Sequence, residues 1–254
     1  MNKKVKLSFC AVIKDNLSNV KRLLENIKDL VDEIVIVDTG SEKEVVDYEK
    51  KNSDKLFEVP WDNDFACMRN YVIKHSKGEW ILTLDSDETI TKELKLKIRQ
   101  IITKNDNNIE GYKLRRVHYA DEPNPLNDYW MHLRLYRCHA NYFGAVHESI
   151  KNLKFLKEIR CRQCSILHHN NRSYQREKSL KYSNYLKEKI KETKANNDKK
   201  MIEYYRYKLW VQDNIYLLET DKNVDTKLLN SKYREYEKRK KIIEKIIHNE
   251  PKKS

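Results

Sequence analysis

The chain has 254 residues, of which 39% are hydrophobic and 36% charged, and its formal net charge at pH 7 is +13. This apolar content can fill a core, so a chain disordered throughout is excluded, and the length allows one large domain or a domain with an extension. No apolar run approaches the roughly 18 residues that a membrane span needs, and the apolar stretch near the start is too short for a secretory signal. We expect neither feature.

The first part of the chain alternates strand-like and helix-like segments. Apolar runs predict strands at residues 7–13, 33–37, 55–59, 80–84, 112–119 and 132–137, and helical spacing predicts helices near residues 20–27, 65–75 and 90–102. Ser18 is the expected N-cap of the first helix, and Asp64 of the second. Alternation of this kind is typical of an α/β domain, which we place at residues 1–172.

The remainder, residues 173–254, is predicted to be an α-helical region. Residues 174–247 form helix-favouring sequence, with breaks near 196–197 and 221–223. The positive charge lies here: residues 1–150 contain 24 Lys+Arg and 25 Asp+Glu, whereas residues 151–254 contain 28 and 14. This basic region suits an acidic partner, nucleic acid or an anionic membrane surface, or is a solvated lysine-rich face.

The segment WILTLDSDE, residues 80–88, runs from an expected buried strand into three carboxylates within four positions. Like charges at this spacing repel one another. Acidic residues are favoured at helix N-termini, so one explanation of the three carboxylates is that a helix starts here. They are explained equally by a hard cation, because Mg²⁺ and Mn²⁺ prefer carboxylate ligands.

The strand ends favour the second explanation. The chain has four glycines and none of the glycine-rich loops that cradle phosphate directly. Asp38 follows one strand and the pair Asp85 and Asp87 follows another, and ligands of open α/β sheets gather at such carboxyl ends. A cation held there would neutralise the carboxylates, bind a diphosphate and stabilise its charge as it leaves.

The five cysteines are scattered, and only Cys161 and Cys164 form a CxxC pair. A zinc site with His168 or His169 is one interpretation of this pair. We expect reduced thiols and a cytoplasmic protein, because a single CxxC without a second pair is not a zinc signature.

The order of the motifs narrows the function further. VDTGS is followed by EVPWDNDFACMRNYVIKHSKGEWILTLDSDE, then by YFGAVHESI and SILHHN. Over about residues 5–185 this order resembles the family 2 glycosyltransferases, in the branch that includes the sublancin-type S-glycosyltransferases. The resemblance implies a GT-A fold, a UDP-sugar donor, Mn²⁺ or Mg²⁺ as cofactor, and inversion of the anomeric centre.

The resemblance also implies roles for individual residues. Asp38 would hold the nucleotide base, and Arg69 would approach the nucleotide and its diphosphate. Asp87 would bind the metal directly, while Asp85 would contact the ribose or the metal through water. His168 would be a third metal ligand, although the neighbouring His169 leaves this assignment open by one position.

The acceptor's proton requires a base, and the resemblance points to the pair His147 and Glu148. Glu148 is the expected base, with His147 as the alternative or as its orienting partner. His169-Asn170-Asn171 departs from the family's x-G-Y after the histidine.

Partners are less defined by the sequence. We expect a glucose or N-acetylglucosamine type of UDP-sugar, and a protein, peptide or cell-surface glycan as acceptor. The C-terminal helices would recognise the acceptor, form a homodimer or contact the inner face of the membrane. Two other functions stay open: a nucleotidyltransferase, and a non-enzymatic protein that binds nucleic acid through the basic helices, which we regard as less favoured.

Overall fold

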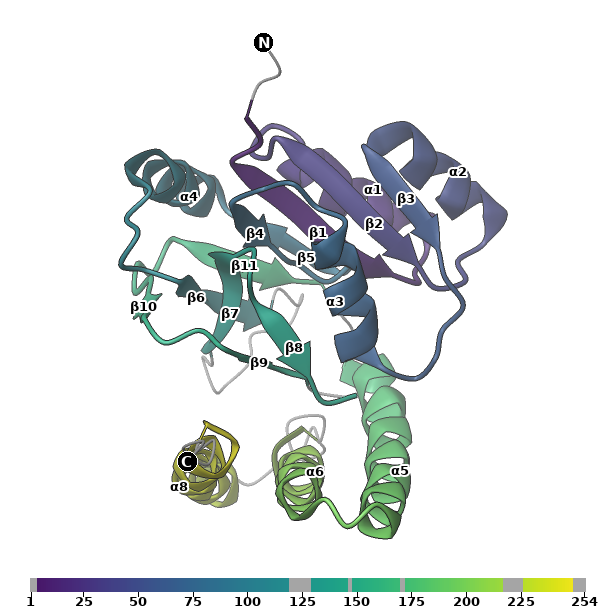
Figure 1. Ribbon diagram of the computed structural model, residues 1–254, viewed down its shortest axis with the longest axis vertical. Helices are drawn as coiled ribbons and strands as arrows, with labels where there is room; N and C mark the ends of the chain where they lie inside the picture. The colour runs from purple at the N-terminus through teal and green to yellow at the C-terminus, as the bar shows by residue number, and fades with distance from the viewer. Residues whose placement is uncertain (1–3, 119–128, 146–147, 170–171, 217–225, 249–254) are drawn as a thin grey trace, which may run out of the picture. The chain divides into compact units, whose positions relative to one another are not determined.

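The computed structural model describes residues 4–118, 129–145, 148–169, 172–216 and 226–248 (Figure 1). Its contacts divide the chain into two units, Met1–Asn170 and Asn171–Ser254. The first unit has the α/β organisation predicted from the sequence, and the second consists of helices.

A mixed sheet is the centre of the first unit, with strand order β3-β2-β1-β4-β7-β6-β11-β5 and with β10 pairing to β6. The strands of this sheet are β1 (Leu7–Ile13), β2 (Glu33–Asp38), β3 (Lys55–Glu58), β4 (Trp80–Leu82), β5 (Glu88–Ile90), β6 (Gly111–His118), β7 (Tyr129–Arg137), β10 (Leu156–Glu158) and β11 (Ser165–His168). The strands β8 (Asn141–Phe143) and β9 (Ser149–Lys151) form a separate antiparallel pair.

Helices cover both faces of this sheet (Figure 1). They are α1 (Leu17–Ile27), α2 (Lys43–Asn52), α3 (Phe65–Lys74) and α4 (Lys92–Lys104). Alternate residues of β1 point to opposite faces, as the pleat of a strand requires. Phe9 and Ile13 pack in the cluster that contains residues of α1, α2 and α4, whereas Cys10 packs in the cluster that contains residues of α3.

Two helix starts test the expected caps. Asp64 accepts a hydrogen bond from the Cys67 N–H at 2.9 Å, so its predicted capping role in α3 is confirmed. The expected cap Ser18 is wrong, because Asn16 accepts from the Asn19 N–H at 3.0 Å and α1 begins at Leu17. Both Asn and Ser suit an N-cap, and the strand β1 ends at Ile13, early enough for α1 to begin at Leu17.

The segment WILTLDSDE does not run into a helix, which the helix-start explanation of its carboxylates required. The strand β4 ends at Leu82, and the chain then turns and joins the sheet again as β5, which pairs antiparallel with β11. The following helix α4 begins only at Lys92, with Thr91 as its N-cap. The carboxylates of residues 85–88 are therefore not the acidic start of a helix.

The cysteine pair also differs from expectation. The structure joins Cys161 and Cys164 by a disulfide, whereas we expected reduced thiols. The Cys164 N–H donates to the Cys161 carbonyl at 3.1 Å, so the two residues close a tight turn directly before β11. The turn brings the two side chains together, which the spacing alone does not fix.

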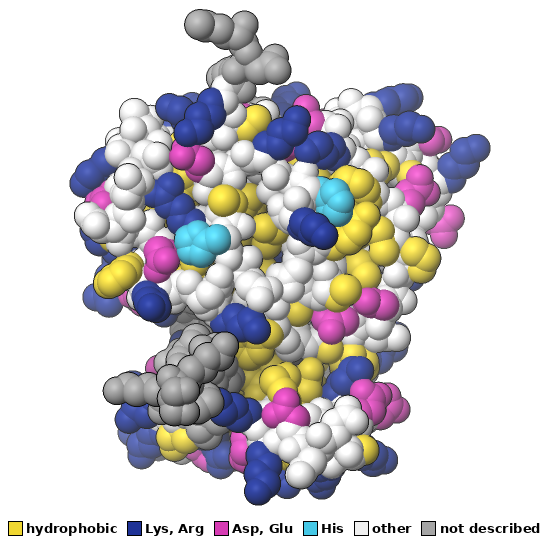
Figure 2. Space-filling view, viewed as in Figure 1, with side chains coloured by type: hydrophobic (Ala, Val, Ile, Leu, Met, Phe, Trp, Pro, Cys, Tyr) yellow, Lys and Arg dark blue, Asp and Glu magenta, His cyan; other side chains and the backbone are white. Residues whose placement is uncertain are grey.

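The second unit is made of α5 (Arg172–Ala195), α6 (Lys199–Val211), a short π-helical segment η1 (Gln212–Tyr216) and α8 (Thr226–His248). Tyr207 of α6 stacks on Tyr236 of α8 with ring centres 6.2 Å apart. Lys and Arg side chains, dark blue in Figure 2, are numerous on the visible surface. None of the helices in the described ranges is long and apolar enough to cross a membrane.

Candidate active site

Asp38 closes β2 and shapes the loop that follows. Its Oδ1 accepts hydrogen bonds from the N–H groups of Gly40 and Ser41, both at 2.9 Å. Gly40 has φ of +112°, a conformation that side chains disfavour. Asp38 itself is only 2% exposed. The carboxylate of Asp38 thus fixes the loop 39–41. Because Asp38 is buried, a ligand at this strand end would meet the loop rather than the carboxylate oxygens.

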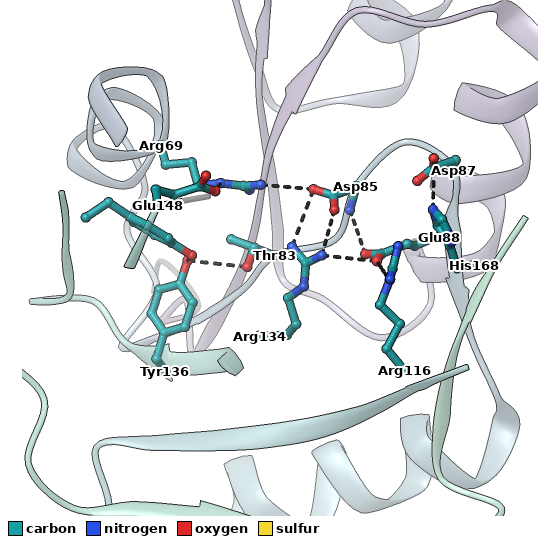
Figure 3. A network of polar contacts seen from close by, with 11 residues as sticks. Arg69, Thr83, Asp85, Asp87, Glu88, Arg116, Arg134, Tyr136, Glu148 and His168 are labelled. Atoms are coloured by element: carbon teal, nitrogen blue, oxygen red, sulfur yellow. Dashed lines mark hydrogen bonds and ion pairs between the residues drawn. The ribbon is translucent and has the colours of Figure 1, made fainter. Parts of the chain in front are cut away.

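Asp85 lies between two guanidinium groups. Arg134 Nη2 donates to its Oδ2 at 2.6 Å, and Arg69 Nη2 donates to its Oδ1 at 2.9 Å (Figure 3). Burial would raise the pKa of Asp85, but Arg134 and Arg69 outweigh it and hold that pKa well below the ordinary range. The side chain keeps 40% exposure, so this anion remains reachable.

Glu88 holds the turn from the other side. Its side chain is fully buried and accepts from the Asp85 N–H at 2.9 Å, from Arg134 Nη2 at 3.0 Å and from Arg116 Nε at 2.6 Å. A buried carboxylate needs such partners because an unpaired one would be costly. Glu88 therefore fixes both the backbone of Asp85 and the direction in which Arg134 points (Figure 3).

Asp87 faces a different partner. His168 Nε2 lies 3.2 Å from Asp87 Oδ2, and the two residues are 4% and 8% exposed. The pair is brought together by β11 and β5, whose register sets His168 opposite Glu88. The His169 N–H also donates to the Asp87 carbonyl at 2.8 Å, which fixes the two segments against each other.

The structure distinguishes the two neighbouring histidines. His169 Nε2 lies 2.7 Å from Thr89 Oγ1, away from the Asp87 carboxylate that His168 meets. Burial lowers the pKa of His169, with Arg22 and His168 adding to the effect. By geometry, His168 is the histidine that shares a site with Asp87.

The donor atoms of Asp87 and His168 fit a divalent ion. Adjacent ligands of an octahedral ion with bonds of about 2.1 Å lie about 3.0 Å apart. The observed separation of 3.2 Å matches this spacing. Within the described ranges no group of three or more His, Cys, Asp and Glu side chains is arranged to hold a metal, and Asp85 is turned to its arginines. Further ligands would have to come from a diphosphate or from water.

Glu148 and Arg69 form the other end of the network. Arg69 Nε donates to Glu148 Oε1 while Nη2 of the same guanidinium reaches Asp85. Burial would lower the pKa of Arg69, but Glu148 and Asp85 raise it well above its ordinary value. Arg69 thus links Glu148, the expected catalytic base, to Asp85. The other expected residue, His147, lies outside the described residues.

Several residues of this network were missed by the sequence analysis. Arg116 lies on β6 and Arg134 on β7, and each is separated from Glu88 by more than 25 residues. His132, also on β7, lies half-buried near them, and desolvation and the two arginines lower its pKa well below the ordinary value. Charged residues in the strand patterns KLRRV and LRLYR were the available signal.

Comparison with known proteins assigns the family. The family model described as "Glycosyl transferase family 2" matches residues 8–183, which contain every site residue described above. The chain belongs to glycosyltransferase family 2. The match confirms the family that the motif order indicated.

Curated relatives cover less of the chain. The prophage-derived glycosyltransferase SunS of Bacillus subtilis is 34% identical over 95 residues, which are 36% of this chain and 22% of SunS. An uncharacterised glycosyltransferase of Rickettsia bellii is 26% identical over 111 residues, 43% of this chain and 37% of that protein. The alignments thus span 22% and 37% of these relatives' lengths.

A solved structure supports the fold. Staphylococcus aureus TarS, residues 1–349, superposes with a TM-score of 0.51 at 13% identity and covers 94% of this chain and 90% of its own. At this identity the likeness concerns the fold alone. It agrees with the expected GT-A domain followed by helices.

Proposed function

We propose that the protein transfers a sugar from a UDP-sugar, in a divalent-metal-dependent reaction with inversion at the anomeric carbon, to a protein, peptide or cell-surface glycan. One observation carries the proposal: Asp87 and His168 meet in a buried pair at 3.2 Å, in a turn whose acidic residues serve no helix start. Family membership supports the sugar nucleotide, and TarS, which has a similar fold, has been crystallised in complex with UDP.

In this proposal Asp87 and His168 hold Mn²⁺ or Mg²⁺. The ion, when bound, supplies positive charge that stabilises the diphosphate as it leaves. An imidazole ligand favours Mn²⁺ over Mg²⁺, because Mg²⁺ prefers oxygen ligands.

The arginines give the same diphosphate a second set of donors. Arg69 and Arg134 each present N–H groups at the exposed rim of Asp85. Guanidinium groups bind phosphate oxygens in paired geometry, so an arriving diphosphate would share them with Asp85. Asp85 keeps the two guanidinium groups aligned before the donor arrives, and contacts the ribose or metal-bound water afterwards.

Glu148 is the proposed base. Its Oε1 accepts from Arg69, so Oε2 is the oxygen that would take the proton of the acceptor nucleophile. The side chain is 13% exposed, so it is largely shielded but not sealed from a ligand. His147 stays the alternative. Asp38 would support the loop 39–41, which would bind the nucleobase of the donor.

The donor sugar is proposed to be of the glucose or N-acetylglucosamine type. The protein is proposed to work in the cytoplasm. Its C-terminal helices would recognise the acceptor or join two copies. The test is UDP release from UDP-glucose and from UDP-N-acetylglucosamine, with Mn²⁺ and with chelator. We expect metal-dependent release that Asp87→Ala abolishes and that Asp47→Ala, an exposed aspartate on α2, leaves unchanged.

The same assay separates the competing enzyme class. Pyrophosphate formed from UTP and a sugar phosphate, with no UDP released from either sugar nucleotide, would contradict the proposal and favour a nucleotidyltransferase.

A further inference from the structure

The outward side of α8 carries a line of basic residues that the proposed transfer reaction does not use. Arg234, Lys238, Lys241 and Lys245 are all exposed, and their spacing of four, three and four residues sets them on one face of the helix. With a rise of 1.5 Å per residue, this outer stripe is about 16 Å long.

Other basic residues of α8 are used inside the unit. The Arg239 guanidinium lies 4.6 Å from the centre of the Trp210 ring and donates to Glu235 at 2.6 Å. Lys232 lies 5.9 Å from the Trp210 ring and Lys240 lies 5.6 Å from the Tyr236 ring. The two cations on Trp210 stabilise the packing of α8 on α6, whereas the Lys240 contact lies within α8 itself.

The outer stripe has no comparable partners. Within the described part of the chain, none of its four residues forms an ion pair, although Glu235 and Glu237 lie on the same helix. Like charges at three- and four-residue spacing repel one another, and this repulsion is relieved when an anion binds across them. The stripe is therefore complementary to a surface of negative charge.

Two apolar residues distinguish a membrane from a soluble polyanion. Leu228 and Ile242 are 45% and 59% exposed and lie 14 residues apart, which places them on the same flank of the outer stripe. Basic side chains that bind anionic headgroups, next to apolar side chains that enter the interface, are typical of helices that lie on membranes. A soluble polyanion would gain nothing from the apolar pair.

We propose that α8 docks on anionic phospholipid headgroups through the outer stripe, with Leu228 and Ile242 inserted at the interface. The contact is peripheral and electrostatic, so it weakens as salt is raised. It is independent of the proposed transfer activity and uses residues of the C-terminal unit alone.

The test is co-sedimentation of the full chain with vesicles of phosphatidylcholine alone and of phosphatidylcholine with phosphatidylglycerol in a three-to-one ratio. We expect binding to the second kind only. Each basic residue near such a surface contributes about fivefold, so reversing all four residues of the outer stripe to glutamate should weaken binding about a hundredfold or more. The double variant Leu228→Ser/Ile242→Ser should lose more vesicle binding, relative to wild type, at high salt than at low salt.

The matched control reverses the same number of charges elsewhere. Lys50, Lys74, Lys92 and Lys97 are exposed and scattered over the first unit. Changing these four to glutamate should leave vesicle binding within about threefold of wild type. Circular dichroism of both variants checks that the helices persist.

Three results would overturn the proposal. They are equal loss of binding in the control variant, absence of wild-type binding to the anionic vesicles, and a wild type that binds polyphosphate or RNA at physiological salt but not vesicles. The last result would assign the outer stripe to a soluble polyanion.

Discussion

The carboxyl group of Glu49, on α2, lies near the carboxyl group of Asp38 at the end of β2, and the charge of Asp38 helps to raise the pKa of Glu49. Glu49 is fully buried, and neither of its oxygens nor Asp38 Oδ2 receives a hydrogen bond from another group in the described structure. Two neighbouring carboxylates with no donor repel one another. Burial and the charge of Asp38 therefore favour the protonated form of Glu49 at neutral pH, beside the carboxylate that holds the loop 39–41.

This pair makes stability depend on pH. Burial and the charge of Asp38 raise the pKa of Glu49 from 4.5 to about 8. Between these values the unfolded chain releases a proton that the folded chain keeps, so the free energy of unfolding falls as pH rises through the window. Glu49→Gln has no proton to lose. We expect it to exceed the wild type by about 2–3 kcal/mol at pH 8.5 and to converge with it near pH 4.5.

Urea unfolding of both proteins across this range measures the difference. Glu44→Gln, an exposed position on the same helix, is the control and should run parallel to the wild type. Parallel curves for Glu49→Gln as well would contradict the raised pKa of Glu49.

Arg134 holds two carboxylates, one of them fully buried. Arg134→Gln leaves the buried Glu88 short of a charged partner, and we expect a loss of about 3 kcal/mol in the free energy of unfolding. The exposed pair Arg99 and Asp29, with side chains 48% and 53% exposed, gives the control. Arg99→Gln should cost less than about 1 kcal/mol. Similar losses in the two variants, measured by denaturant unfolding, would show that the network around Glu88 adds no stability.

The two neighbouring histidines should separate in metal binding. His168→Ala removes a donor atom that lies 3.2 Å from Asp87 Oδ2, so Mn²⁺ binding in the presence of UDP should weaken by about tenfold or more. His169→Ala removes a contact with Thr89 and should change stability more than Mn²⁺ affinity. Isothermal titration of Mn²⁺ into each protein is the measurement. The reverse order of affinities would reassign the ligand to His169.

The disulfide before β11 closes a short loop. A crosslink across so few residues restricts the unfolded chain modestly, so its reduction should lower the free energy of unfolding by about 2 kcal/mol. Cys161→Ser should show the same loss, and dithiothreitol should then have no further effect. Thiol counting by mass spectrometry checks the pairing. Dithiothreitol that leaves wild-type stability unchanged would mean that the thiols are reduced in solution.

Local patterns predicted the parts of the fold that depend on local physics. The apolar run at Leu7–Ile13 became β1, and Asp64 became a helix cap. The helix α2 was not predicted, because few of its residues face the core: of its ten, only Val45 and Glu49 are buried. A buried glutamate looks like a surface residue in a sequence.

The site was predicted only in part, for a related reason. The motif order led to Asp85, Asp87 and His168, but the pairing of Asp87 with His168 depends on the register of β5 against β11. Arg134 meets Asp85 across 49 residues of sequence. No local pattern carries such pairings, because they arise from the order of strands in the sheet.

The most direct test of the proposed donor site is thermal unfolding with UDP, ADP and GDP, each with and without Mn²⁺, on wild type, Asp87→Ala and Asp47→Ala. A ligand that binds the folded state raises the melting temperature by mass action. We predict stabilisation by UDP that requires Mn²⁺, that Asp87→Ala loses and that Asp47→Ala retains. No shift of the wild type by any nucleotide, with or without Mn²⁺, would contradict a metal–diphosphate site at Asp87 and His168.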